Sequence, residues 1–187
     1  MVMSYEEIDA LMTAPGQPFE IEQIDVEGRS FRDWKNAAPT LAAILEQSRG
    51  FGDREFIVYG DESVTYAEHY RRAAAVARRL VEDCGIVPGD RVAIAMRNYP
   101  EWCIAFWAVT AAGAVVVPLN AWWTSEELAY GLTDSGTRVI FVDRERLDRL
   151  QAIQSQLPLE QVIATRCEVL PEGVIDFQSL LADAPVD

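Results

Sequence analysis

The sequence has 187 residues, 50% of them hydrophobic and 25% charged, as in a soluble globular protein of one domain or a large part of one. Thirty acidic and sixteen basic residues give a formal net charge of −14, which argues against nucleic acid and anionic membranes as partners. Three widely spaced cysteines without a CxxC pair, and a single histidine, argue against a Cys/His metal site and indicate reduced thiols in a cytosolic protein.

The N-terminal part of the chain is the least regular in its pattern. Its first residues, MVMSYEEIDALM, lack the basic and apolar stretches of a signal peptide, and Ser4-x-x-Glu7 is a capping box that predicts a helix start. A second helix is expected over Asp33 to Arg49, through Leu41, Ile44 and Leu45. We expect residues 1–55 to form an irregular segment, with helices and a possible hairpin, that wraps around the rest.

Residues 56–66 contain two short β-rich runs around Gly60-Asp61, which predicts a hairpin. The box Thr65-x-x-Glu68 then opens a helix over residues 66–84. Four arginines on one face of that helix could form an anion patch. A solvated face of ion pairs is favoured because three pairs lie at i,i+4: Glu68–Arg72, Arg78–Glu82 and Arg79–Asp83. The only histidine, His69, lies inside this helix, where a surface or packing role is expected.

From residue 91 onward, short apolar runs alternate with helical patterns. The predicted strands cover residues 92–95, 115–118, 139–142 and 162–164. The predicted helices begin at Pro100 and Thr124, run from Leu147 towards Pro158, and cover residues 177–181, with Gly136 ending the second of them. This alternation predicts an α/β domain over residues 56–187, with a mostly parallel sheet and helices on both faces.

Trp102 to Ser125 contains no charged residue and is long enough to span a bilayer. However, the stretch carries Gly113 and Pro118, and acidic residues flank it where a membrane span would have Lys or Arg. We therefore expect a buried helix, a strand and a loop.

No phosphate-binding or nucleophile motif occurs: GxxxxGK[ST], GxGxxG after a strand and GxSxG are all absent from the sequence. Lys35 is the only lysine, although enzymes that handle ATP phosphates usually provide fixed positive charge. The residues alone therefore indicate an α/β domain with no catalytic residue and no metal ligand that can be named.

Five segments resemble a known family. They are Thr65-Tyr-Ala-Glu-His-Tyr70, Gly89-Asp-Arg-Val-Ala-Ile94, Asn98-Tyr-Pro-Glu-Trp102, Ala112-Gly-Ala-Val-Val-Val-Pro-Leu-Asn120 and Glu127-Leu-Ala-Tyr-Gly-Leu-Thr-Asp-Ser-Gly136. In order and spacing, from about residue 40 to 143, they resemble the start of adenylate-forming acyl-CoA synthetases. Met12-Thr-Ala-Pro-Gly16 and Phe31-Arg-Asp-Trp34 are similar to the fatty-acid–CoA ligase branch.

The resemblance implies the N-terminal subdomain of the adenylate-forming enzyme fold. Members of the family join a carboxylate to ATP as an acyl-adenylate, release pyrophosphate and pass the acyl group to CoA. The implied cofactors are ATP, Mg and CoA, and the implied partners are a fatty acid and the remainder of the chain, with a homodimer left open. The phosphate loop, the ribose-binding aspartate and the catalytic lysine of the family would follow residue 187, so the chain by itself is expected to be truncated and inactive. A cytoplasmic location is expected.

Two alternatives stay open. One is a ligase for an aryl or other small carboxylic acid, and the other is a stand-alone, non-catalytic interaction module with this fold.

The resemblance also assigns roles to single residues. Gly113 and Gly136 are expected in turns, and Trp102 and Phe106 in the core. Relatives often carry an arginine near the CoA nucleotide where this sequence has Trp122. Trp122 and Trp123 are therefore candidates for the CoA path, with packing against a neighbouring helix as the alternative. We expect at least one of these two rings on the surface. Cys103, on the apolar helix, is expected to be the most buried of Cys84, Cys103 and Cys167.

Overall fold

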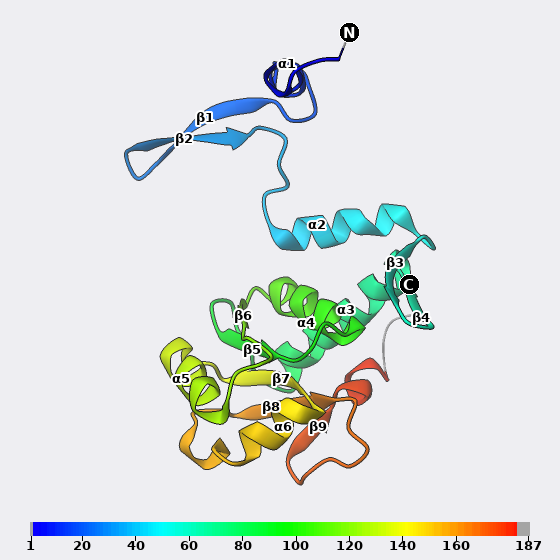
Figure 1. Ribbon diagram of the computed structural model, residues 1–187, viewed down its shortest axis with the longest axis vertical. Coiled ribbons are helices and arrows are strands. Elements are labelled where there is room, and N and C mark those ends of the chain that lie inside the picture. Colours follow the sequence, from blue (N-terminus) through cyan, green and yellow to red (C-terminus); the bar gives the residue numbers. More distant parts are fainter. Residues whose placement is uncertain (1, 183–187) are drawn as a thin grey trace. The chain divides into compact units, whose positions relative to one another are not determined.

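The structure is a computed structural model that describes residues 2–182. Its internal contacts divide the chain after Thr40 into two compact units, which are described separately (Figure 1). The expected boundary between residues 55 and 56, and the expected wrapping of residues 1–55 around the sheet, stay predictions.

The first unit consists of one helix and one antiparallel hairpin. Its elements are α1 (Tyr5–Met12), β1 (Ile21–Val26) and β2 (Arg29–Trp34). The capping box of Ser4 and Glu7 opens α1 as predicted. Glu27 and Gly28 both have positive φ, at 53° and 78°, as the two central residues of a tight type I′ hairpin turn require. Among the described residues 2–40 none is buried, as expected for a segment too short to enclose a core.

The helix predicted over Asp33 to Arg49 is wrong in its first part. Asp33 and Trp34 belong to β2, where they pair with Glu22 and Ile21. The helix of this region, α2, covers Leu41–Ser48, and a 3₁₀ turn follows at Arg49–Phe51. Pro39 explains the later start, because a proline disfavours helical backbone in the residue before it.

The second unit is built on a five-stranded parallel sheet with the order β6-β5-β7-β8-β9. The strands are β5 (Arg91–Ala95), β6 (Val115–Pro118), β7 (Val139–Asp143), β8 (Gln161–Thr165) and β9 (Val174–Asp176). The first four match the predicted strands, and β9 adds an edge strand of three residues that the sequence analysis did not anticipate. A separate antiparallel hairpin, β3 (Glu55–Tyr59) and β4 (Glu62–Thr65), confirms the predicted turn at Gly60-Asp61.

Helices cover both faces of the sheet, as predicted (Figure 1). They are α3 (Tyr66–Glu82) and α4 (Pro100–Ala111) on one face, and α5 (Ser125–Ser135) and α6 (Arg144–Gln151) on the other. Two 3₁₀ turns follow, at Gln154–Gln156 and at Phe177–Leu181, and the second packs in the same cluster as α3 and α4. Successive residues of a strand point to opposite faces of the sheet, so they belong to two different hydrophobic clusters, one on each face. In β5, Val92 and Ile94 pack under α3 and α4, whereas Ala93 and Ala95 face α5 and α6. The α/β fold class is confirmed.

The arginine face of α3 carries ion pairs, as predicted. Arg72 pairs with Glu68, Arg79 lies 3.0 Å from Asp83, and Arg78 lies 3.9 Å from Glu82. His69, in the same helix, is buried, so its expected packing role is confirmed. Such partly exposed pairs contribute little stability individually, which leaves the apolar face of α3 as the main source of its docking.

Helix α4 is less buried than its apolar composition predicts. Trp102 and Phe106 stack at 5.6 Å between ring centroids and contact the core from its border. Cys103 is half-buried, whereas Cys84, just after α3, is buried in the core cluster, so the predicted ranking of these thiols is wrong. All three cysteines are free thiols. Among the described residues no helix is both long enough and apolar enough to cross a membrane.

Candidate functional site

The strand order creates a topological switch point at the carboxyl ends of β5 and β7. After β5 the chain passes through α4 to β6 on one side, and after β7 it passes through α6 to β8 on the other side. Open parallel sheets bind their ligands outside the carboxyl ends of the strands at such a point, because the two diverging connections leave a crevice there. A ligand site is therefore expected at the carboxyl ends of the strands.

An open cleft of about 680 Å³ lies at this end of β5 and β6. Its walls are mainly aromatic rings and side-chain amides with one guanidinium: Tyr59, Met96, Arg97, Asn98, Tyr99, Trp102, Pro118, Leu119, Asn120, Ala121 and Trp122. These described residues include no carboxylate, so the donor set does not fit Mg²⁺, which prefers carboxylate and phosphate oxygens. Aromatic faces beside a positive charge fit an anionic ligand that contains a flat ring.

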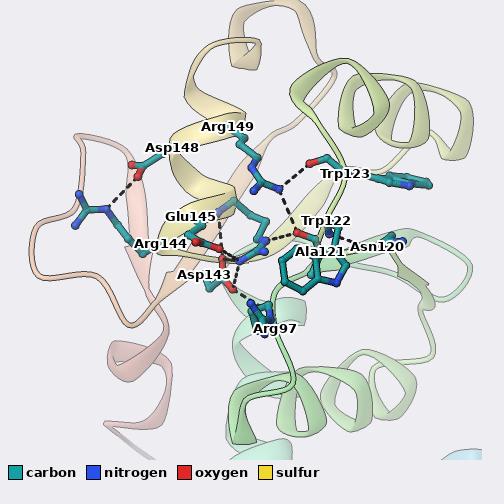
Figure 2. A network of polar contacts seen from close by, with 11 residues as sticks. Arg97, Asn120, Ala121, Trp122, Trp123, Asp143, Arg144, Glu145, Asp148 and Arg149 are labelled. Carbon is teal, nitrogen blue, oxygen red and sulfur yellow. Dashed lines mark hydrogen bonds and ion pairs between the residues drawn. The ribbon is translucent and has the colours of Figure 1, made fainter.

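The two tryptophans point to different surroundings (Figure 2). Trp122 is 67% exposed and lines the cleft, and the guanidinium carbon of Arg97 lies 4.4 Å from its ring centroid. Trp123 is half-buried against the α5 side, where a β-carbon on Gly131 would lie 2.7 Å from its ring. The prediction that at least one ring is exposed is confirmed for Trp122, and the packing alternative describes Trp123.

The loop that carries Trp122 is held by arginines of α6 (Figure 2). Arg146 Nε donates to the carbonyl oxygen of Ala121 at 2.6 Å, and Arg149 Nη1 donates to the carbonyl oxygens of Ala121 and Trp123 at 3.2 and 2.8 Å. Within the loop, the backbone N–H of Trp122 donates to Asn120 Oδ1 at 2.9 Å. These bonds fix the peptide group between Ala121 and Trp122 and the one that follows Trp123, so the exposed ring of Trp122 projects from a backbone that is held on both sides.

Asp143, the last residue of β7, connects Arg146, which holds the loop, to Arg97, which follows β5. Its carboxylate accepts from Arg146 Nη1 through both oxygens, at 3.1 and 2.9 Å, and from the backbone N–H groups of Arg146 and Arg97, at 3.1 and 2.9 Å. Asp143 and Arg146 are 2% and 1% exposed. A buried ion pair of this kind is costly to desolvate and depends on complete hydrogen bonding. Arg146 Nη2 has no partner among the described residues.

The opposite wall of the cleft is fixed by Arg166, directly after β8. Its guanidinium lies over the rings of Tyr59 and Tyr99, at 5.2 and 4.6 Å, and donates to the carboxylates of Glu62 and Glu101. Arg166 also has a φ of 56°, which is uncommon for a residue with a side chain. One residue thus ties the β3–β4 hairpin to the start of α4 and holds Tyr59 and Tyr99 together in one wall of the cleft.

Sequence reasoning found Trp122 and Trp123 but missed Arg97, Asp143, Arg146 and Arg166. The available signal was positional: Arg97, Asp143 and Arg166 each stand directly at or after the end of a buried apolar run. Polar residues at the carboxyl ends of parallel strands meet at one edge of the sheet, so this position marks them as candidate site residues.

Comparisons with known proteins identify relatives of this chain. The sequence model of the family described as AMP-binding enzyme matches residues 44–185. An oxalate–CoA ligase of Arabidopsis thaliana is 38% identical over 150 residues, covering 79% of this chain and 29% of that protein. A long-chain-fatty-acid–CoA ligase of Escherichia coli O6:H1 is 30% identical over 128 residues, covering 68% of this chain and 23% of that protein.

A solved structure has the same fold. The crystal structure of an anthranilate CoA ligase in complex with anthranoyl-AMP aligns with a TM-score of 0.73 at 24% identity, over 78% of this chain and 28% of that one. The chain therefore spans less than a third of the length of the two curated ligases and of this structure.

Proposed function

The chain belongs to the AMP-binding enzyme family, and on that basis we propose that it is the N-terminal part of an adenylate-forming acid–CoA ligase. The proposed reaction of the whole enzyme converts a carboxylate, ATP and CoA into an acyl-CoA, AMP and pyrophosphate. The observation that carries the proposal is the family match over residues 44–185, which covers nearly the whole second unit. Purified full-length enzyme should release AMP only when ATP, CoA and a suitable carboxylic acid are all present.

We propose a fatty acid as the substrate, supported by the similarity to the long-chain-fatty-acid–CoA ligase and by the segments at residues 12–16 and 31–34. A small carboxylic acid is the second candidate, because the identity to an oxalate–CoA ligase is higher, at 38%. Comparing kcat/KM for a long-chain fatty acid, an aryl acid and oxalate separates these candidates. The three free cysteines fit a reducing compartment, so a cytoplasmic location is part of the proposal.

We propose that the cleft at the carboxyl ends of β5 and β6 is part of the CoA path. Arg97 supports this role because it puts a guanidinium against the exposed ring of Trp122, where the loop itself offers no basic side chain. The CoA nucleotide combines a flat base with phosphates, so the base could stack on Trp122 while Arg97 faces a phosphate. Trp123 would act indirectly, by filling the space over Gly131 and holding the loop.

Replacing Trp122 by alanine in the full-length enzyme tests this role. Because stacking of a base on an aromatic ring contributes roughly 1–3 kcal/mol, KM for CoA should rise about fivefold or more. The adenylation half-reaction, measured by ATP–pyrophosphate exchange, should stay nearly unchanged. Tyr130→Ala is the matched control, since Tyr130 is an equally exposed aromatic residue outside the cleft. Equal losses in both half-reactions would show that Trp122 has a packing role instead.

We also expect the 187-residue chain alone to form no acyl-adenylate. By family resemblance, the phosphate loop and the catalytic lysine follow residue 187, and Lys35, the only lysine present, pairs with Glu20 at 2.7 Å. Carboxylate-dependent ATP–pyrophosphate exchange by the purified chain should therefore equal the rate without protein. Exchange clearly above that background would contradict the assignment of the catalytic groups.

A further inference from the structure

Arg166 has an unusual backbone conformation for its position. Among residues 2–182, two residues other than glycine have positive φ. One is Glu27, in a hairpin turn that requires this conformation. The other is Arg166, with a φ of 56°, which directly follows the largely buried strand β8 at the carboxyl end of the sheet. Left-handed backbone is unfavourable for a residue with a β-carbon, and such residues gather at functional sites, so Arg166 is a candidate for a functional role.

The side chain of Arg166 connects two aromatic rings of the cleft with two carboxylates. Its guanidinium carbon lies 5.2 Å from the ring centroid of Tyr59 and 4.6 Å from that of Tyr99, and these two rings pack edge to face at 5.6 Å between centroids. Nη2 donates to both carboxylate oxygens of Glu62, at 3.0 and 2.9 Å, and Nε donates to Glu101 at 3.2 Å. Both tyrosines line the cleft, whereas Arg166 does not. Arg166 is therefore placed to act on a ligand in the cleft through these two rings.

The position of Tyr59 depends on this support. Tyr59 belongs to the β3–β4 hairpin, which among the described strands is a two-stranded sheet of its own, so no ladder of the five-stranded sheet holds it. Tyr59 and Glu62 are cross-strand partners on either side of the Gly60-Asp61 turn. Arg166 contacts both of them and therefore holds the hairpin at its tip. The side chain of Glu62 is 52% exposed, and ion pairs of this kind contribute little to stability, so the main expected effect is on where the tip lies.

We propose that Arg166 is a positioning residue for CoA, which holds the tip of the hairpin so that the ring of Tyr59 stays beside that of Tyr99 in the wall of the cleft. The inference rests on the proposed CoA path. A ligand that meets an already ordered ring loses less conformational entropy than one that must order it, so a fixed wall binds more tightly. Without Arg166, the tip loses its ion pair and its stacking partner together. The loss falls on CoA binding and not on the reaction of ATP with the carboxylate, because the cleft is assigned to CoA.

Arg166→Met in the full-length enzyme tests the proposal, because methionine keeps an unbranched apolar stem and removes the guanidinium. KM for CoA should rise about threefold to tenfold, as expected for the loss of a cation–π contact, while ATP–pyrophosphate exchange stays nearly unchanged. Arg166→Lys keeps the charge without the planar fork that pairs and stacks, so it should restore only part of the affinity. Arg79→Met is the matched control: its side chain is 29% exposed against 28% for Arg166, it pairs with Asp83 at 3.0 Å, and it lies outside the cleft.

A double-mutant cycle with Tyr59→Ala shows whether Arg166 acts through this ring. If it does, Arg166→Met should raise KM for CoA little further once the ring is absent. A merely structural role predicts additive effects instead, or equal losses in both half-reactions, and either result would overturn the proposal. Glu62→Ala removes only the ion pair at the exposed tip of the hairpin, so it replaces Arg166→Met if that variant does not fold. It should raise KM for CoA by a smaller factor, and an unchanged KM would count against the proposal.

The comparison with Trp122→Ala separates this inference from the proposed function. If Trp122→Ala raises KM for CoA and Arg166→Met does not, the CoA path stands and the role of Arg166 is wrong. If Trp122→Ala leaves KM for CoA unchanged, the CoA path is wrong and the inference falls with it. A full-length enzyme that releases no AMP with any carboxylic acid and CoA would overturn the proposed reaction itself.

Discussion

Asp143→Ala is expected to lower the free energy of unfolding by about 3–5 kcal/mol, the usual cost of removing one partner of a buried ion pair. The substitution leaves Nη1 of Arg146 without the carboxylate to which it donates, at a site where that side chain is 1% exposed. It also removes the cap of α6 and the acceptor for the N–H of Arg97. Glu145 still contacts Arg146 at 2.6 Å but is largely exposed, so it compensates only in part. Urea denaturation of the chain measures the change.

Two controls separate charge from packing in this result. Asp143→Asn keeps an oxygen acceptor for the helix cap and should cost less than Asp143→Ala. The double substitution Asp143→Leu with Arg146→Met removes both charges and should recover much of the lost stability, because well-packed apolar groups can replace a buried pair. If the double variant is as unstable as Asp143→Ala, the loop contact of Arg146 matters more than the uncompensated charge. A loss below about 1 kcal/mol for Asp143→Ala would contradict the buried pair.

Acidification is expected to destabilise the chain through His69. The pKa of this ring falls from 6.5 to about 4 in the folded protein, mainly because burial disfavours the charged form. Below pH 6.5 the unfolded state therefore binds a proton that the folded state rejects, so stability decreases as the pH falls and increases as it rises. The loss is complete near pH 4 and amounts to about 3 kcal/mol, at 1.36 kcal/mol for each pKa unit.

The comparison with His69→Phe isolates this contribution from the carboxylates, which titrate in the lower part of the same range. The difference in unfolding free energy between the two proteins should be constant above pH 7 and should change by about 3 kcal/mol between pH 6.5 and 4 in favour of the variant. His69 is the only histidine, so no other imidazole contributes. Parallel pH profiles for the two proteins would show that the ring is not buried in its neutral form.

Most of the second unit follows from local sequence patterns. Continuous apolar runs identified four of the five strands, and the capping boxes at Thr65 and Thr124 placed the starts of α3 and α5. The local sequence patterns did not predict where α6 ends or that β9 exists, because tertiary contacts determine both. The apolar spacing from Leu147 to Leu157 suggested one helix, but α6 ends at Gln151 and a 3₁₀ turn follows. The three residues of β9 are too few for any periodicity to appear.

The candidate site was only partly predictable. Two adjacent tryptophans in a loop after a strand were enough to suggest an exposed ring, and Trp122 is that ring. Arg97 and Asp143 are neighbours only because the strand order β6-β5-β7 puts the ends of β5 and β7, which are distant in sequence, beside each other. No local pattern specifies that order. The pairing of Arg146 with Asp143 was equally hidden, because i,i+3 contacts of this type usually lie on helix surfaces.

The contacts of α6 with the 120–123 loop have a consequence for biosynthesis. The loop is complete in sequence at Trp123, but the side chains that hold its carbonyl groups, Arg146 and Arg149, are translated later. The central pairing of β5 with β7 likewise joins segments on either side of β6 and α5. Such non-local parallel pairing is slow to form. On the ribosome, the cleft therefore acquires its ordered wall only after α6 has emerged from the exit tunnel and docked on the sheet.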